Sequence, residues 1–140
     1  MGKIKKIDHL GIMVPSIEQG IETFKRILLR EPSRREYIDA YKVDLAFFDI
    51  GDVQVELLAP TASDSEFMPF LKQTGGGFHH ICYEVEGIDE ILENLKRSGV
   101  KLIDEKTRPG SRNSLIAYVE AASAGGVYTE YCEFPARMEK

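Results

Sequence analysis

Two histidines and two glutamates stand out in this sequence because each lies near the middle of an apolar, strand-like segment. They are His9, Glu56, His80 and Glu130. Imidazole nitrogens and carboxylate oxygens are ligands that divalent transition metals accept. A single strand histidine is more often a hydrogen-bonded structural residue, and a strand glutamate can simply face solvent. A metal site therefore needs support from a second feature of the chain.

That support comes from an internal repeat, a feature that often reveals the architecture of a fold. Residues 7–26 align with residues 78–97 without a gap, and the alignment places His9 on His80. Each copy has the alternating pattern of a strand, then a turn, then the spacing of an amphipathic helix. The two histidines therefore occupy equivalent positions in two related halves.

The later parts of the two halves match more loosely. Residues 43–60 and 114–135 each contain a strand, a glycine turn and a second strand with a central glutamate. This match places Glu56 on Glu130. Two imidazoles and two carboxylates related by an approximate twofold repeat could converge on one divalent metal ion.

The strand that follows the glycines of Gly75–Val85 (GGGFHHICYEV) carries further polar groups. Strand side chains alternate between faces, so His80, Cys82 and Glu84 share one face, and the opposite face is mostly apolar. Glu84 is a candidate for proton transfer, or an ordinary salt-bridged carboxylate. Cys82 and Cys132 fit small buried apolar residues, although a zinc site with thiolate ligands is the alternative.

The remaining elements are expected to position these groups. Ser16 has the character of a helix N-cap, with Gln19 three residues on as in a capping box. The polar segment 33–42 is either a loop or an edge strand. The other expected elements follow the chain as a hairpin over Gly51-Asp52, helices 66–73 and 88–98, a strand at 100–104 and a C-terminal tail at 136–140.

Composition limits the class of protein. The 140 residues fit a single domain, which we divide into module one (about 3–60), a linker helix region (61–74) and module two (about 75–135). The formal net charge of −5 gives no indication of a nucleic-acid-binding surface. The absence of a long apolar run predicts no membrane span and a cytoplasmic protein, in which the two cysteines are reduced.

A basic segment, Lys106–Asn113 (KTRPGSRN), follows the helix expected at 88–98. It contains Lys106, Arg108 and Arg112. Such a loop suits a phosphate-bearing substrate, and a solvated turn is the alternative interpretation.

Several segments resemble the vicinal oxygen chelate superfamily, which includes glyoxalase I, extradiol dioxygenases and bleomycin-resistance proteins, and most closely its methylmalonyl-CoA epimerase branch. They are spread in order over nearly the whole chain. The segments are IDHLGIMV (7–14), IGDVQVELLAP (50–60), FLKQTGGGFHHICYEV (70–85), LIDEKTRPG (102–110) and GGVYTEYCE (125–133).

The resemblance implies an α+β fold of two tandem βαβββ modules, whose mixed sheet curls into a cup with helices outside, in a homodimer. It implies that His9, Glu56, His80 and Glu130 ligate one divalent metal ion. Zinc, cobalt, nickel, manganese and iron all accept such ligands. It also implies that Glu130 moves a proton, with Glu84 or Asp44 as candidate partners.

The sequence departs from the epimerase pattern at three places. Val119–Ser123 stands where epimerases often carry His-Pro-Lys, and Lys42-Val43 stands where Gly-Val is common. Some members also have a further catalytic glutamate, at a position that is Leu45 here.

The expected activity is metal-dependent epimerisation of methylmalonyl-CoA or a similar 2-acyl-CoA. The first alternative is a glyoxalase I-like lyase acting on a thiol hemithioacetal. The second is a resistance-type protein that binds a small molecule.

Overall fold

The computed structural model describes residues 2–135, so the expected tail at 136–140 lies outside the described residues. The element order is β1 (Lys3–Met13), α1 (Ile17–Leu28), β2 (Arg34–Ile38), β3 (Val43–Ile50), β4 (Val53–Pro60), α2 (Met68–Thr74), β5 (Gly77–Glu86), α3 (Ile88–Arg97), β6 (Arg108–Pro109), β7 (Leu115–Val119) and β8 (Tyr128–Glu133). Short 3₁₀ helices span Ser111–Asn113 and Ala121–Ser123.

The order of elements confirms the repeat and the α+β class. Each half runs strand, helix and three strands, as β1-α1-β2-β3-β4 and then β5-α3-β6-β7-β8, with α2 between them. Parallel and antiparallel strand pairs both occur in each half. Within the described residues, no helix has the length and apolar character needed to cross a membrane.

The chain forms two compact units, and both long strands contribute to each of them. The first-half unit is His9–His79. Within the described residues, the second-half unit contains residues 2–8 and 80–135. The unit boundaries therefore fall inside β1 and β5 and not at the linker.

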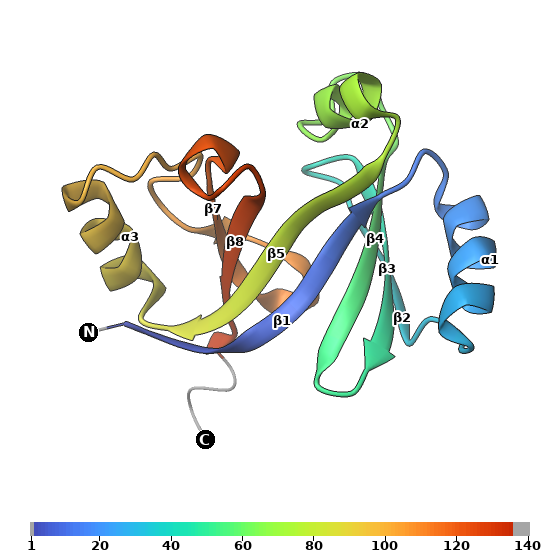
Figure 1. Ribbon diagram of the computed structural model, residues 1–140, viewed down its shortest axis with the longest axis horizontal. Helices are drawn as coiled ribbons and strands as arrows, with labels where there is room; N and C mark the ends of the chain where they lie inside the picture. Colours follow the sequence, from blue (N-terminus) through green and yellow to red (C-terminus); the bar gives the residue numbers. More distant parts are fainter. Residues whose placement is uncertain (1, 136–140) are drawn as a thin grey trace. The chain divides into compact units, whose positions relative to one another are not determined.

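In the first-half unit the strand order is β2-β3-β4-β1. β1 runs parallel to β4, and the other neighbours are antiparallel. α1 covers one face of this sheet (Figure 1). The buried residues on that face and on the helix are Val14, Ile17, Ile21, Ala46, Phe48, Leu57 and Ala59. The opposite face is free of this helix and carries the polar groups described below.

The start of α1 confirms the expected N-cap. Ser16 has extended backbone angles, and its side chain accepts a hydrogen bond of 3.3 Å from the Gln19 backbone N–H. Such a cap satisfies one of the backbone donors that the first helical turn leaves without a partner.

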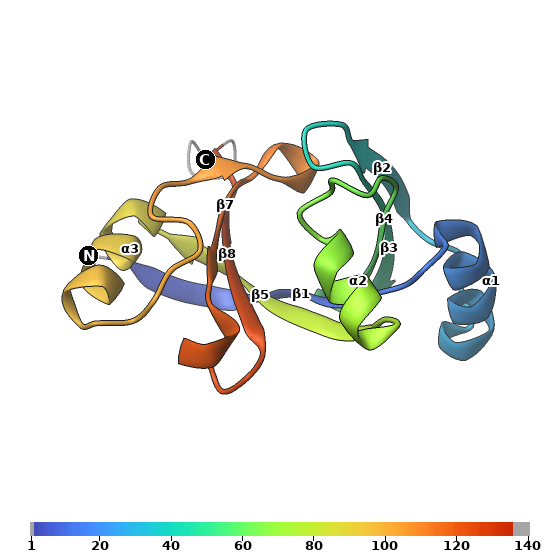
Figure 2. The same cartoon turned by 90° about the horizontal axis from the view of Figure 1, so that it is seen from above.

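In the second-half unit the strand order is β5-β8-β7-β6. α3 lies against one face of this sheet (Figure 2). The buried residues of this cluster are Val85, Ile88, Leu92 and Ala117. α3 begins without a side-chain cap from its own first residues. Instead the Glu133 carboxylate on β8 accepts hydrogen bonds from the backbone N–H groups of Gly87 (3.0 Å) and Ile88 (3.1 Å).

The structure decides between the two interpretations of segment 33–42, and it corrects the strand expected at 100–104. Residues 34–38 form β2, a strand at the edge of the first-half sheet, so the edge-strand interpretation of segment 33–42 is correct. The segment 100–104 makes only an isolated bridge, between Leu102 and Val119, and is not a regular strand.

Candidate active site

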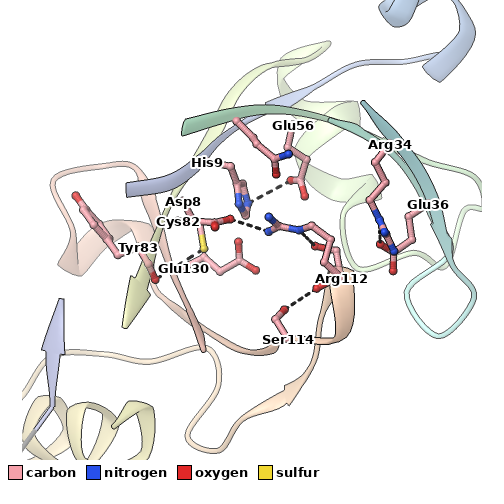
Figure 3. Close-up of polar contacts among 12 residues, drawn as sticks. Asp8, His9, Arg34, Glu36, Glu56, Cys82, Tyr83, Arg112, Ser114 and Glu130 are labelled. Atoms are coloured by element: carbon pink, nitrogen blue, oxygen red, sulfur yellow. Dashed lines mark hydrogen bonds and ion pairs between the residues drawn. The ribbon is translucent and has the colours of Figure 1, made fainter. Parts of the chain in front are cut away.

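The first-half unit contains one buried histidine–glutamate pair. His9 lies on β1 and Glu56 on β4, and these strands are hydrogen-bonded neighbours. The His9 Nε2 and Glu56 Oε1 atoms are 3.6 Å apart (Figure 3). The two side chains are only 3% and 6% exposed. The Phe47 ring packs edge-on against the imidazole, with 6.2 Å between the ring centroids.

The second-half unit contains the equivalent pair. His80 lies on β5 and Glu130 on the neighbouring strand β8. The His80 Nε2 and Glu130 Oε1 atoms are 3.2 Å apart, and both side chains are buried. The Tyr118 ring packs edge-on against this imidazole, with 5.5 Å between centroids. The repeat seen in the sequence is therefore also a repeat of side-chain geometry.

The chemistry of both pairs fits a divalent cation. A buried carboxylate is costly without a compensating charge, and an imidazole supplies that charge only when it is protonated. A cation bound by Nε2 and by the carboxylate removes this requirement. Two ligands that each lie about 2.1 Å from a tetrahedral ion are roughly 3.4 Å apart. The observed separations of 3.6 Å and 3.2 Å lie on either side of this value.

Glu84 is buried in the second-half unit, on the face of β5 that also carries His80. Its carboxylate lies 3.5 Å from the Lys5 ammonium group on β1. This ion pair compensates the charge of a side chain that is only 4% exposed. The sequence pointed to Glu84 but not to this partner, because Lys5 is one of several lysines near the N-terminus.

The two cysteines are buried and not bonded to each other. Burial, contact with Cys132 and the nearby Glu130 charge raise the pKa of the Cys82 thiol well above its usual value. A neutral thiol is a poor metal ligand. This environment favours the small-apolar-residue interpretation over the thiolate zinc site.

The basic loop is more than a solvated turn. The Arg112 Nη2 atom lies 2.6 Å from the Asp8 Oδ2 atom, and these side chains are 13% and 4% exposed (Figure 3). The Arg112 guanidinium also packs over the Phe134 ring, 5.1 Å from its centroid. Arg112 adopts a left-handed backbone conformation, with φ of 56°. Asp8, the residue before the candidate ligand His9, is therefore tied to the loop.

Arg108 makes a second ion pair of the same kind. Its Nε atom lies 3.1 Å from the Asp104 Oδ1 atom, and its guanidinium lies 5.7 Å from the centroid of the Tyr118 ring. The Asp104 carboxylate also accepts a hydrogen bond of 2.9 Å from the Tyr118 backbone N–H. Sequence reasoning identified the arginines but missed both aspartate partners. Asp8 is 104 positions from Arg112. Asp104 is only four residues before Arg108, but these residues were not expected to form a helix, in which that spacing brings side chains together.

The third histidine, His79, has a structural environment. Its ring packs edge-on against the rings of Phe70 and Phe67, with centroid distances of 4.7 Å and 5.7 Å. These phenylalanines lie in and just before α2. His79 therefore belongs to the apolar packing of the first-half unit.

A family model now decides the class of protein. The model of the Glyoxalase/Bleomycin resistance protein/Dioxygenase superfamily matches residues 8–118. The chain belongs to this superfamily. The match spans the two histidine positions and Glu56, and it confirms the resemblance that the sequence segments indicated.

Named relatives narrow the comparison within the superfamily. The chain is 34% identical over 130 residues to the uncharacterised protein YqjC of Bacillus subtilis, covering 93% of each sequence. It is 30% identical over 126 residues to the mitochondrial methylmalonyl-CoA epimerase of Homo sapiens, covering 89% of this chain and 72% of the human protein.

A solved structure has the same fold. It is a Streptomyces coelicolor methylmalonyl-CoA epimerase variant in complex with 2-nitronate-propionyl-CoA. The two structures superpose with a TM-score of 0.89 at 27% sequence identity, covering 96% of this chain and 97% of the other.

Proposed function

We propose that this protein is a metal-dependent epimerase of methylmalonyl-CoA or a similar 2-acyl-CoA. The observation that carries the proposal is the repeated buried His–Glu pair, 3.6 Å and 3.2 Å apart, in the two halves of the chain. The named epimerases among its relatives support the reaction class. An acyl-CoA bound in the Streptomyces coelicolor structure supports the substrate class.

The residues that would hold the metal ion are His9, Glu56, His80 and Glu130. The buried side chains of His9, Glu56 and His80 each offer a ligand atom of a type that metal sites use. The repeat supports adding Glu130, because it pairs with His80 as Glu56 pairs with His9. A divalent ion would act as a Lewis acid that lowers the energy of the enolate oxygen.

Proton transfer at C2 falls to the side chains of the protein. The proton beside a thioester carbonyl is weakly acidic, and its removal leaves an enolate. Epimerisation needs one group to take the proton and another to return a proton to the opposite face of C2, each contributing about 10²–10⁴-fold. Glu130 is proposed as one of these groups. The Glu84 carboxylate, which forms an ion pair with Lys5, is a candidate to assist Glu130 in this proton transfer.

The test is isotope exchange at C2. Metal-loaded protein is incubated with methylmalonyl-CoA in D₂O, and deuterium incorporation is followed by NMR. We expect incorporation that requires metal and is lost in His80→Ala. The matched control is His79→Ala, which removes an adjacent buried histidine that packs against Phe67 and Phe70. It should retain exchange once its folding has been verified by circular dichroism.

One result would reject the epimerase proposal. That result is the absence of exchange from protein shown to be folded and to contain metal. The glyoxalase I-like alternative uses the same ligand types, so the same samples would then be assayed with thiol hemithioacetals. Turnover of a hemithioacetal together with inert methylmalonyl-CoA would establish the lyase instead.

A further inference from the structure

The proposed reaction needs a second proton-transfer group, and β3 does not supply one. Leu45, the position at which some epimerases carry a further glutamate, is apolar and 4% exposed. Asp44 directly precedes Leu45 in the strand, and because strand side chains alternate, the Asp44 side chain lies on the other face. The second group must therefore come from another strand.

Strand register identifies a carboxylate beside Leu45. The antiparallel pairing of β2 with β3 places Glu36 directly opposite Leu45. Directly opposed residues project from the same face of a sheet. The edge strand β2 thus carries a glutamate where the neighbouring strand lacks one.

The same register places Glu36 on the face that carries the first-half pair. β3 pairs with β4 so that Phe47 lies opposite Glu56, and Phe47 shares a face with Leu45 because strand side chains alternate. α1 covers the other face, through Ala46 and Phe48. Glu36 therefore projects from the same side of the first-half sheet as Glu56, as the labelled side chains in Figure 3 show.

The environment of Glu36 suits a group that moves protons. Its side chain is 22% exposed, which leaves the carboxylate accessible to substrate and to solvent. The Arg34 Nε atom lies 3.3 Å from the Glu36 Oε1 atom. Arg34 lies two residues away and on the same face, so the ion pair orients the carboxylate along the strand without burying it.

We propose that the Glu36 carboxylate is the second proton-transfer group, in place of the glutamate that is absent at Leu45. This inference rests on the proposed function. Neighbouring strands are about 5 Å apart, so the Glu36 backbone lies one strand further from β4 than Leu45 does.

The proton balance of the step is simple. The Glu36 carboxylate accepts the proton from C2 of one epimer, and the electron pair of the broken C–H bond enters the enolate. Glu130 then donates a proton to C2 on the opposite face, and the new C–H bond uses the enolate electrons. The reverse reaction exchanges the roles of the two carboxyl groups. No oxidant or other reactant is needed.

The test uses single epimers of methylmalonyl-CoA and the variant Glu36→Gln. We expect epimerisation to fall by at least about 100-fold. Deuterium exchange should persist for the one epimer whose proton Glu130 removes, and it should proceed with retention of configuration. Binding of methylmalonyl-CoA, measured by titration calorimetry, should change by less than about threefold, because the carboxylate acts on a proton and not on the CoA group.

A matched control and a rescue variant accompany this measurement. Glu18→Gln removes another glutamate that pairs with an arginine, 3.0 Å from Arg35, on the exposed side of α1. It should leave the epimerisation rate unchanged. Leu45→Glu, added to Glu36→Gln, should restore epimerisation at least tenfold, because it returns a carboxylate to the adjacent strand on the same face.

The outcomes separate the two proposals. The wild-type protein could epimerise methylmalonyl-CoA while Glu36→Gln keeps an epimerisation rate within about threefold of wild type. This result would overturn the role of Glu36 and leave the proposed function intact. Equal loss of exchange from both epimers in Glu36→Gln would also overturn the role of Glu36, because Glu130 should still exchange the proton of one epimer. Wild-type protein that binds methylmalonyl-CoA without exchange would overturn both.

Discussion

The buried ion pair between Asp8 and Arg112 allows a stability prediction to be worked out in detail. Removal of one partner of a buried pair leaves an uncompensated charge and costs about 3–5 kcal/mol. The Arg112 side chain retains 13% exposure, so part of this cost is relieved by water. We therefore expect Asp8→Asn and Arg112→Gln each to lower the free energy of unfolding by about 3 kcal/mol.

The double variant distinguishes this explanation from loss of packing alone. Once both charges are gone, neither substitution leaves a buried charge behind. Asp8→Asn/Arg112→Gln should therefore be destabilised by no more than either single variant, which corresponds to a coupling energy of at least about 3 kcal/mol. Urea unfolding followed by circular dichroism, with EDTA present to exclude effects on metal binding at His9, gives all four values. Additive single effects, or single effects below about 1 kcal/mol, would refute the reasoning.

Three further predictions concern local features. Glu133→Ala should lower the free energy of unfolding by about 2 kcal/mol, because the Gly87 and Ile88 N–H groups lose their acceptor; a loss below about 0.5 kcal/mol in urea unfolding would contradict it. Ser16→Ala should cost about 1 kcal/mol in the same assay, and an unchanged midpoint would show that this cap is dispensable. Native Cys82 should resist iodoacetamide at pH 8, since burial raises the pKa of its thiol and keeps it neutral at that pH; alkylation followed by mass spectrometry at the rate of a small free thiol would contradict this.

The sequence predicted the features that depend on local pattern and on the repeat. The alternation around His80, the helix start at Ser16 and the strand–helix–strand–strand order all follow from side-chain periodicity, capping chemistry and glycine turns. The equivalence of His9 with His80 also required only the alignment of one half on the other. Apart from the repeat, these features are encoded within windows of about 20 residues.

The features that the sequence did not reveal depend on contacts between distant segments. Arg112 meets Asp8 across 104 positions of the chain, and no spacing rule connects them. The pairing of Glu36 with Leu45 depends on the turn between β2 and β3, where Lys42 adopts a positive φ of 50° without being glycine. A turn without the usual glycine signal left both the strand β2 and its register undetermined.

The most direct test of the account is the metal content of the purified protein. After loading with zinc or cobalt and removal of excess ion, elemental analysis should find one divalent ion per chain. The ion should be lost on separate substitution of His9 and of His80 by Ala, and retained in His79→Ala. Two ions per chain would contradict the account, because each His–Glu pair would then bind its own metal. Folded protein that retains no ion under any loading condition would contradict it as well.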